Sequence, residues 1–161
     1  MRRVLLGCTL ALLTAALGVA SANASAHARD ASAPFAAKAN AICAKAIGQA
    51  KAAGRIYTFA KPRALFAAAV TKGPKWVAVD RATLKALQAL KPGPNDEPGT
   101  WKVMLVKHRQ STDDLVRAIA ADKAGRKQAF VDLFTKSSTE GGGFGLRAFA
   151  LGIRTCENWV P

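Results

Sequence analysis

The sequence predicts an all-α fold, an antiparallel four-helix bundle preceded by a signal peptide. Apolar residues recur every three or four positions through most of the 161-residue chain, which is the period of an amphipathic helix. No run alternates apolar and polar residues as a half-buried strand does. Glycines and prolines divide the periodic part into four segments with short connections. We expect one helical domain over residues 34–161, enough chain to bury a core of its own.

Residues 1–24 have the three regions of a secretory signal peptide. Two arginines open the chain, residues 4–19 form an apolar run, and a small-x-small motif permits cleavage after Ala24 or, alternatively, after Ala28. The apolar run is shorter than a retained membrane anchor needs. We therefore expect a flexible mature N-terminus over residues 25–33 and a secreted or extracytoplasmic protein with no transmembrane segment.

The first helix is expected at Pro34–Ala50, and it carries a cysteine on its apolar face. That face combines Phe35, Ala39, Ile42, Cys43, Ala46, Ile47 and Ala50. Outside the signal peptide, the other cysteine is Cys156, and two cysteines in an exported chain indicate one structural disulfide. The chain-entropy model gives closure of so long a loop roughly 4–5 kcal/mol. Neither cysteine belongs to a CxxC motif, so a redox or metal-binding role is not indicated.

The second helix is expected to be bent. Pro62 is suited to the first turn of a helix, and the helical pattern continues to Lys91. Gly73-Pro74 interrupts it, because proline lacks a backbone N–H and clashes with the preceding turn. The sequence therefore predicts a second helix kinked at Gly73-Pro74, with two collinear pieces.

A loop rich in proline separates the second and third helices. It covers residues 91–98, and Asn95 or Asp96 is a candidate cap for the helix that follows. The third helix is expected to carry these residues on one face: Trp101, Met104, Leu105, His108, Thr112, Leu115 and Ile119.

The last helical segment begins near Asp122 and meets three consecutive glycines. Gly141–Gly143 lower helix propensity by roughly 3 kcal/mol relative to alanine, yet the apolar rhythm continues through them. We therefore expect a last helix broken or kinked at Gly141–Gly143. A second apolar strip is expected to carry the disulfide back onto the first helix; it consists of Leu146, Phe149, Ile153 and Cys156.

Several short motifs span most of the mature chain. They are Ala39-Asn40-Ala41-Ile42-Cys43, the spacing of Leu84, Leu87, Leu90 and Pro92, Trp101, and Leu151-Gly152-Ile153-Arg154-Thr155-Cys156. Together they resemble a group of small exported, disulfide-linked helical proteins of high-GC Gram-positive bacteria. That group has no assigned activity, so the resemblance implies the helical fold and the paired cysteines but no functional residue.

The sequence contains no catalytic constellation, cofactor motif or metal-ligand cluster, so a non-catalytic protein without a cofactor is expected. His108 and Met104 have the spacing of a haem ligand pair, but no CxxCH motif accompanies them. A histidine bonded within the core is the favoured interpretation. The alternative is a small-molecule or enzymatic site between the helices, haem-binding or similar to that of the exported chorismate mutases, lined by Trp101, His108 and Arg109.

Charge is the property that bears most on partners. The formal net charge is +14, and loss of Arg2 and Arg3 with the leader leaves about +12. The remaining lysines and arginines are scattered, which is typical of a generally solvated basic surface rather than a specific patch. We predict weak association with an anionic cell-envelope polymer or a phospholipid surface; nucleic acid is not indicated.

Overall fold

The computed structural model describes residues 32–54 and 62–157, with the side chains of residues 62–66 left aside. The predicted signal peptide, both cleavage sites and the connection at residues 55–61 lie outside this part. The described residues form five helices and no strand. The helices are α1 (Ala33–Ala52), α2 (Pro62–Gln88), α3 (Pro98–Lys123), α4 (Lys127–Ala150) and α5 (Arg154–Glu157). The predicted all-α class is confirmed.

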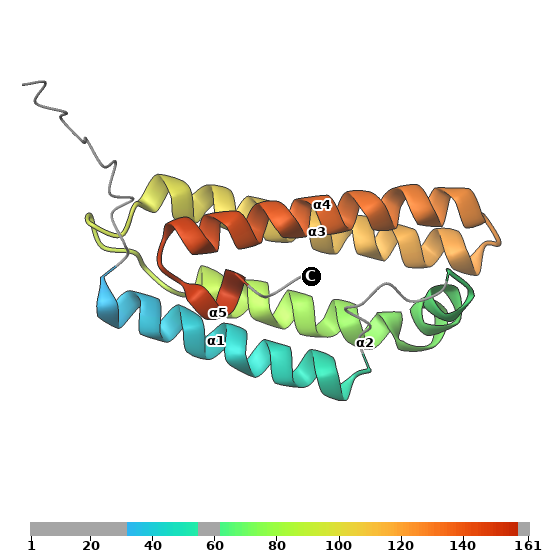
Figure 1. Cartoon of the computed structure of the whole chain (residues 1–161), viewed down its shortest axis with the longest axis horizontal. Helices are drawn as coiled ribbons and strands as arrows, with labels where there is room; N and C mark the ends of the chain where they lie inside the picture. Colours follow the sequence, from blue (N-terminus) through green and yellow to red (C-terminus); the bar gives the residue numbers. More distant parts are fainter. Residues whose placement is uncertain (1–31, 55–61, 158–161) are drawn as a thin grey trace, which may run out of the picture.

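The helices form a closed series in which each packs on the next. α1 packs on α2, α2 on α3, α3 on α4, α4 on α5, and α5 returns to α1. Figure 1 shows α3 and α4 side by side above α1 and α2, with the short α5 between α4 and α1, and consecutive long helices running in opposite directions. In the part of the chain that is described, α1 and α4 do not pack directly on each other, and α5 packs on both of them.

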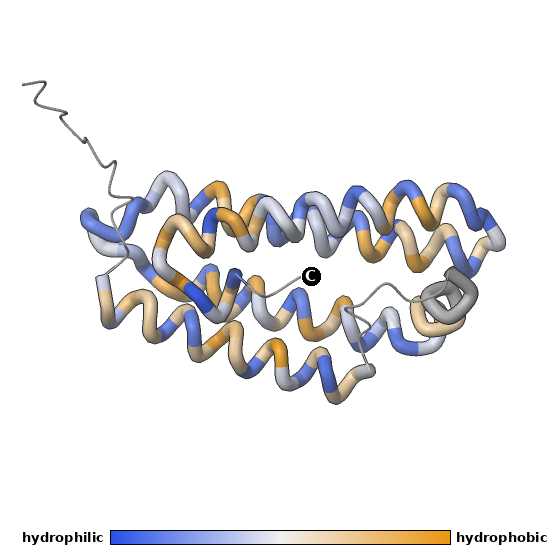
Figure 2. The backbone as a smooth tube through the Cα atoms, viewed as in Figure 1, coloured by the Kyte–Doolittle hydropathy of each residue, from blue (hydrophilic) through white to orange (hydrophobic). Residues whose placement is uncertain are grey.

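Two clusters of buried apolar side chains make the core. Figure 2 shows hydrophobic and hydrophilic positions interspersed along every long helix, as an amphipathic pattern requires. The first cluster, here called the disulfide core, consists of Phe35, Ala39, Cys43, Ala46, Ala50, Leu87, Trp101, Met104, Phe144, Ala148, Leu151, Ile153 and Cys156. The second, the α2–α3 core, consists of Ala68, Ala69, Trp76, Val77, Leu115, Ala118, Ile119, Ala121 and Phe130.

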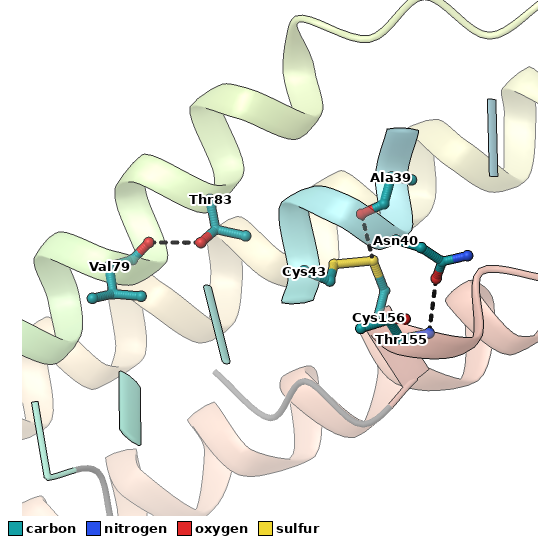
Figure 3. The surroundings of a disulfide bond; sticks show 7 residues. All are labelled: Ala39, Asn40, Cys43, Val79, Thr83, Thr155 and Cys156. Atoms are coloured by element: carbon teal, nitrogen blue, oxygen red, sulfur yellow. Dashed lines mark hydrogen bonds between the residues drawn. A yellow bond between two sulfur atoms is a disulfide. The ribbon is translucent and has the colours of Figure 1, made fainter. Parts of the chain in front are cut away.

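The predicted disulfide between Cys43 and Cys156 is confirmed. The two Cα atoms are 5.2 Å apart and both cysteines are fully buried (Figure 3). Beside the bond, the backbone N–H of Thr155 donates to the side-chain oxygen of Asn40 at 2.8 Å. The Cys156 Sγ, which carries no proton in a disulfide, lies 3.5 Å from the carbonyl oxygen of Ala39. The bond therefore fixes α5 tightly against the middle of α1.

α2 remains one helix through Gly73-Pro74, but it changes direction. Figure 1 shows its first part, in darker green, running in a different direction from the rest, as expected for a helix with an internal proline. Gly73 also allows a close approach to α3, because a Cβ there would lie 2.6 Å from Cδ1 of Ile119. The sequence signal for a bend thus coincides with a tight contact between two helices.

The expected break at Gly141–Gly143 does not occur, because α4 is a single helix from Lys127 to Ala150. The buried face of α4 explains this. Ser137 before the glycines, Gly141 among them and Phe144 after them are all buried. Tertiary packing of these residues offsets the low helix propensity of the glycines.

The expected second apolar strip is wrong. Leu146 is 72% exposed and Phe149 is 50% exposed, although Ile153 and Cys156 are fully buried. The reason is that α4 ends at Ala150 and the chain turns at Gly152, whose φ of 69° lies in the left-handed region. The helical register therefore does not continue from α4 into α5, and the disulfide is carried by a separate short helix.

Removing the disulfide should destabilise the fold at the junction of α1, α4 and α5. Reduction, or the double variant Cys43→Ala with Cys156→Ala, should lower the free energy of unfolding by about 2–5 kcal/mol. Urea unfolding with and without reductant measures the change. Hydrogen exchange should rise first in α5 and the adjoining end of α4 rather than in α3. An unchanged unfolding midpoint would contradict this role.

Two glycines of α4 should respond to alanine with opposite signs. A Cβ at Gly142 would meet no heavy atom within 4 Å, so Gly142→Ala should raise the free energy of unfolding by about 0.5–1 kcal/mol. A Cβ at Gly145 would lie 2.8 Å from the backbone oxygen of Glu157, so Gly145→Ala should lower it by about 1–3 kcal/mol. Parallel urea unfolding tests both variants. Equal effects would show that α5 does not press on α4 at Gly145.

Candidate functional site

The structure does not bring Trp101, His108 and Arg109 to one place. Trp101 is buried near the start of α3, where its ring meets that of Phe35 edge-on at 4.9 Å between centroids. His108 is fully enclosed two turns later, with its ring centroid 4.9 Å from that of Phe144. Arg109 is on the exposed face of α3. The first two side chains belong to packed interior and the third to the surface.

A layer of buried polar side chains crosses α3 and α4 near His108. The Ser111 hydroxyl donates to the Ser137 carbonyl at 2.7 Å, and the Ser137 hydroxyl donates to the Ser111 carbonyl at 2.9 Å. The Thr112 hydroxyl donates to the His108 carbonyl at 2.9 Å. The two bonds between Ser111 and Ser137 hold α3 to α4, and the Thr112 bond lies within α3; together they satisfy the buried hydroxyls. They are structural bonds, because each hydroxyl is engaged with the backbone.

Four of the acidic residues are buried, which the sequence reasoning missed. They are Asp80, Asp96, Asp114 and Asp122. Asp114 forms ion pairs with Arg117 at 3.1 Å and Lys136 at 3.2 Å. Asp122 pairs with Lys127. Helical spacing could have predicted the burial of two of them. Asp80 follows Trp76 by about one turn, and Asp122 follows Ile119 by about one turn, on the apolar faces of their helices.

Asp96 holds two segments together instead of capping α3, so the expected capping role is wrong. Its carboxylate accepts the backbone N–H of Ser32 at 2.5 Å and that of Gly93 at 2.6 Å. α3 begins after Glu97, which has a positive φ of 49° and makes no side-chain cap. The hydrogen bond from Ser32, followed by that from Gly93, lowers the pKa of Asp96 from its ordinary value of 3.8. The start of α1 is thus tied to the loop before α3.

The basic side chains have the opposite distribution from these acids. Every lysine and arginine with a described side chain is exposed or half-buried, and none lies in the core. Some are paired at the surface, as Lys107 is with Glu140 at 2.7 Å and Arg154 is with Glu157 at 3.9 Å. Most of the charged side chains exposed on the described residues are therefore basic.

Among the described residues, two surface depressions are considered as binding sites. One, of about 650 Å³, is open to solvent and lies along α4. Its lining residues are Thr139, Gly141, Gly142, Gly143, Gly145, Leu146, Phe149 and Glu157. The other, of about 250 Å³, lies between α2 and α3. It is lined by Pro74, Val77, Arg81, Val116, Ile119, Ala120 and Lys123. Neither depression is lined by Trp101, His108 or Arg109.

The described residues hold neither a metal-ligand cluster nor a membrane-spanning helix. Among them, no group of three or more histidine, cysteine, aspartate or glutamate side chains is placed to hold a metal ion. None of the helices in the described ranges combines the length and the apolar character that crossing a membrane requires.

Comparison with known proteins gives no match. No protein-family model matches the chain, and no curated protein or solved structure does so either. A function must therefore be inferred from the chain's own residues. Their most distinctive feature is that four acids are buried whereas every described lysine and arginine is exposed or half-buried.

Asp96→Asn should destabilise the protein near neutral pH and matter less in acid. A carboxyl group with a lowered pKa stabilises the folded state above its unfolded-state pKa, and this contribution is lost as the pH falls through the folded-state pKa. Because the pKa of Asp96 is lowered from 3.8, the loss should occur below that pH. Urea unfolding at a series of pH values measures the difference between wild type and variant.

The matched control is Glu97→Gln, which makes the same charge change at the exposed neighbour. Its difference from wild type should stay small across the series. A destabilisation by Asp96→Asn that is equally large in acid and at neutral pH would contradict an ionised carboxylate holding Ser32 and Gly93.

Proposed function

We propose that this protein is an exported, non-catalytic helical module that associates electrostatically with an anionic partner of the cell envelope, either a polymer or a phospholipid surface. In this proposal the signal peptide at residues 1–24 delivers the chain outside the cytoplasm. The four long helices serve as an antiparallel four-helix bundle, and α5 with its disulfide closes that bundle. The module presents positive charge and performs no reaction.

The observation that carries the proposal is the predominance of basic over acidic side chains at the described surface. Asp80, Asp114 and Asp122 are each at most 4% exposed, so they contribute little to the solvent-exposed surface. The exposed lysines and arginines are distributed over all four long helices. A surface of this kind attracts anionic polymers and membranes from any direction. Binding is expected to be weak and to tolerate many orientations.

The resemblance to small exported, disulfide-linked helical proteins supports the same proposal. Its motif residues lie where the structure is most constrained: Cys43 bonds Cys156, Asn40 accepts the N–H of Thr155, and Trp101 packs against Phe35. Of these residues, Phe35, Cys43, Trp101 and Cys156 belong to the disulfide core. In this proposal the motif residues stabilise the protein outside the cell. The choice of partner then depends on the surface charge.

The proposal predicts binding to anionic vesicles that weakens steeply with salt. The mature, oxidised protein should sediment with vesicles containing phosphatidylglycerol at low ionic strength and should be released as salt approaches 1 M. The reason is that the Debye length falls from about 10 Å at 0.1 M to about 3 Å at 1 M. Co-sedimentation across a salt series measures this, and an anionic wall polymer immobilised on a sensor tests the other partner.

Vesicles of phosphatidylcholine alone are the control, because they offer the same hydrocarbon without net charge. Equal binding to both kinds of vesicle, or binding that is independent of salt, would contradict an electrostatic association. Absence of binding at low salt to both the anionic vesicles and the polymer would do the same.

A further inference from the structure

The depression between α2 and α3 has an apolar floor and a cation at each end. Along α2, Pro74, Val77 and Arg81 follow one another about one turn apart, and on α3 Val116, Ala120 and Lys123 do the same. These six residues, with Ile119, are here called the α2–α3 groove. Because the two helices run in opposite directions, Arg81 lies at the Val116 end and Lys123 at the Pro74 end. Seven residues of helix separate the two ends by roughly 10 Å.

The floor of the groove is part of the hydrophobic core. Val77 is 8% exposed and Ile119 is 6% exposed, and both belong to the α2–α3 core. The close approach of Gly73 to Ile119 brings the two helices together beside Pro74. A hydrocarbon chain in the groove would therefore lie directly on packed apolar side chains, which favours its removal from water.

The charged groups of the groove are both positive. Its lining includes Arg81 and Lys123 and no acidic residue. Within the described residues, several other cations form ion pairs with acids, such as Lys107 with Glu140 and Lys136 with Asp114. Arg81 and Lys123 form none with a described acid. An anionic group at either end of the groove would meet a cation that no such carboxylate neutralises.

We propose that the α2–α3 groove binds the anion of a fatty acid, with one hydrocarbon chain along Val77, Ile119 and Ala120 and its carboxylate at Arg81 or Lys123. The combination of an apolar floor and cationic ends matches an amphiphile with one chain and one negative group. A volume of about 250 Å³ suits a single chain of medium length rather than the two chains of a phospholipid. This inference goes beyond the proposed function, because it requires a defined site and not a dispersed charge.

Octanoate is the probe, with octanol and acetate as comparators. Octanol has the chain without the charge, and acetate has the charge without the chain. Titration into the mature, oxidised protein, followed by backbone amide NMR shifts, should give saturable binding of octanoate with shifts concentrated on α2 and α3 around the groove. Octanol should bind more weakly and acetate should not saturate. Absence of octanoate binding, or shifts located along α4 instead, would overturn the proposal.

Matched variants separate the groove from general charge. The double variant Arg81→Gln with Lys123→Gln should weaken octanoate binding by about fivefold or more. Lys38→Gln with Lys102→Gln makes the same charge change at exposed positions outside the groove and should leave octanoate affinity within about twofold. Equal weakening by both double variants would overturn the site.

A third variant fills the groove without altering charge. Ala120 is exposed and lines the groove, so Ala120→Phe should keep the fold, as urea unfolding would verify, and should abolish binding of both octanoate and octanol. Retained binding in a folded variant would overturn the proposal. Binding to anionic vesicles should fall equally in the two double variants. Absence of octanoate binding would therefore overturn the groove proposal and leave the electrostatic proposal intact. Absence of vesicle binding would overturn the electrostatic proposal and leave the groove proposal intact.

Discussion

The placement of α5 is the constraint on which the remaining packing depends. α1 meets α4 through this helix of four residues, which is far too short to be stable alone. Three contacts hold it: the bond from Cys43 to Cys156, the hydrogen bond from Thr155 to Asn40, and the close passage of Glu157 over Gly145. A second tie lies nearer the start of α1, where Asp96 holds Ser32 to the loop before α3. α1 is therefore secured at two points by bonds to segments distant in sequence.

Burial of charge links this fold to its surface properties. Buried carboxylates are tolerated when they are paired or accept backbone N–H groups, and Asp96, Asp114 and Asp122 have such partners. The partners Lys127 and Lys136 are themselves exposed, so their positive charge is partly neutralised from beneath. Other cations, Arg81 among them, form no ion pair with a described acid. The surface potential therefore depends on which acidic residues are buried as well as on the number of lysines and arginines in the chain.

The sequence predicted the helices and the disulfide well, because periodicity and a two-cysteine count are properties of the chain itself. It left a break or a kink open at Gly141–Gly143, and of these the break is wrong, because burial of Phe144 and Ser137 keeps α4 continuous. It failed again at Leu146 and Phe149, because a turn at Gly152 ended the register that the strip required. For the site, neighbouring residues on one helix point about 100° apart. His108 falls on the buried face of α3 and Arg109 on its exposed face, whereas the inward position of Asp80 was readable from its spacing.

The two proposals are compatible, because dispersed charge acts on a partner at long range and the α2–α3 groove acts on a ligand only at contact. Long-range attraction raises the concentration of the protein near an anionic surface without selecting an orientation. The groove acts only at contact, because its apolar floor at Val77 and Ile119 gains nothing until water is displaced. An anionic lipid surface is where single-chain amphiphiles accumulate, so attraction to that surface would bring the groove to its ligand. Charge would then govern encounter, and the fit between α2 and α3 would govern what is retained.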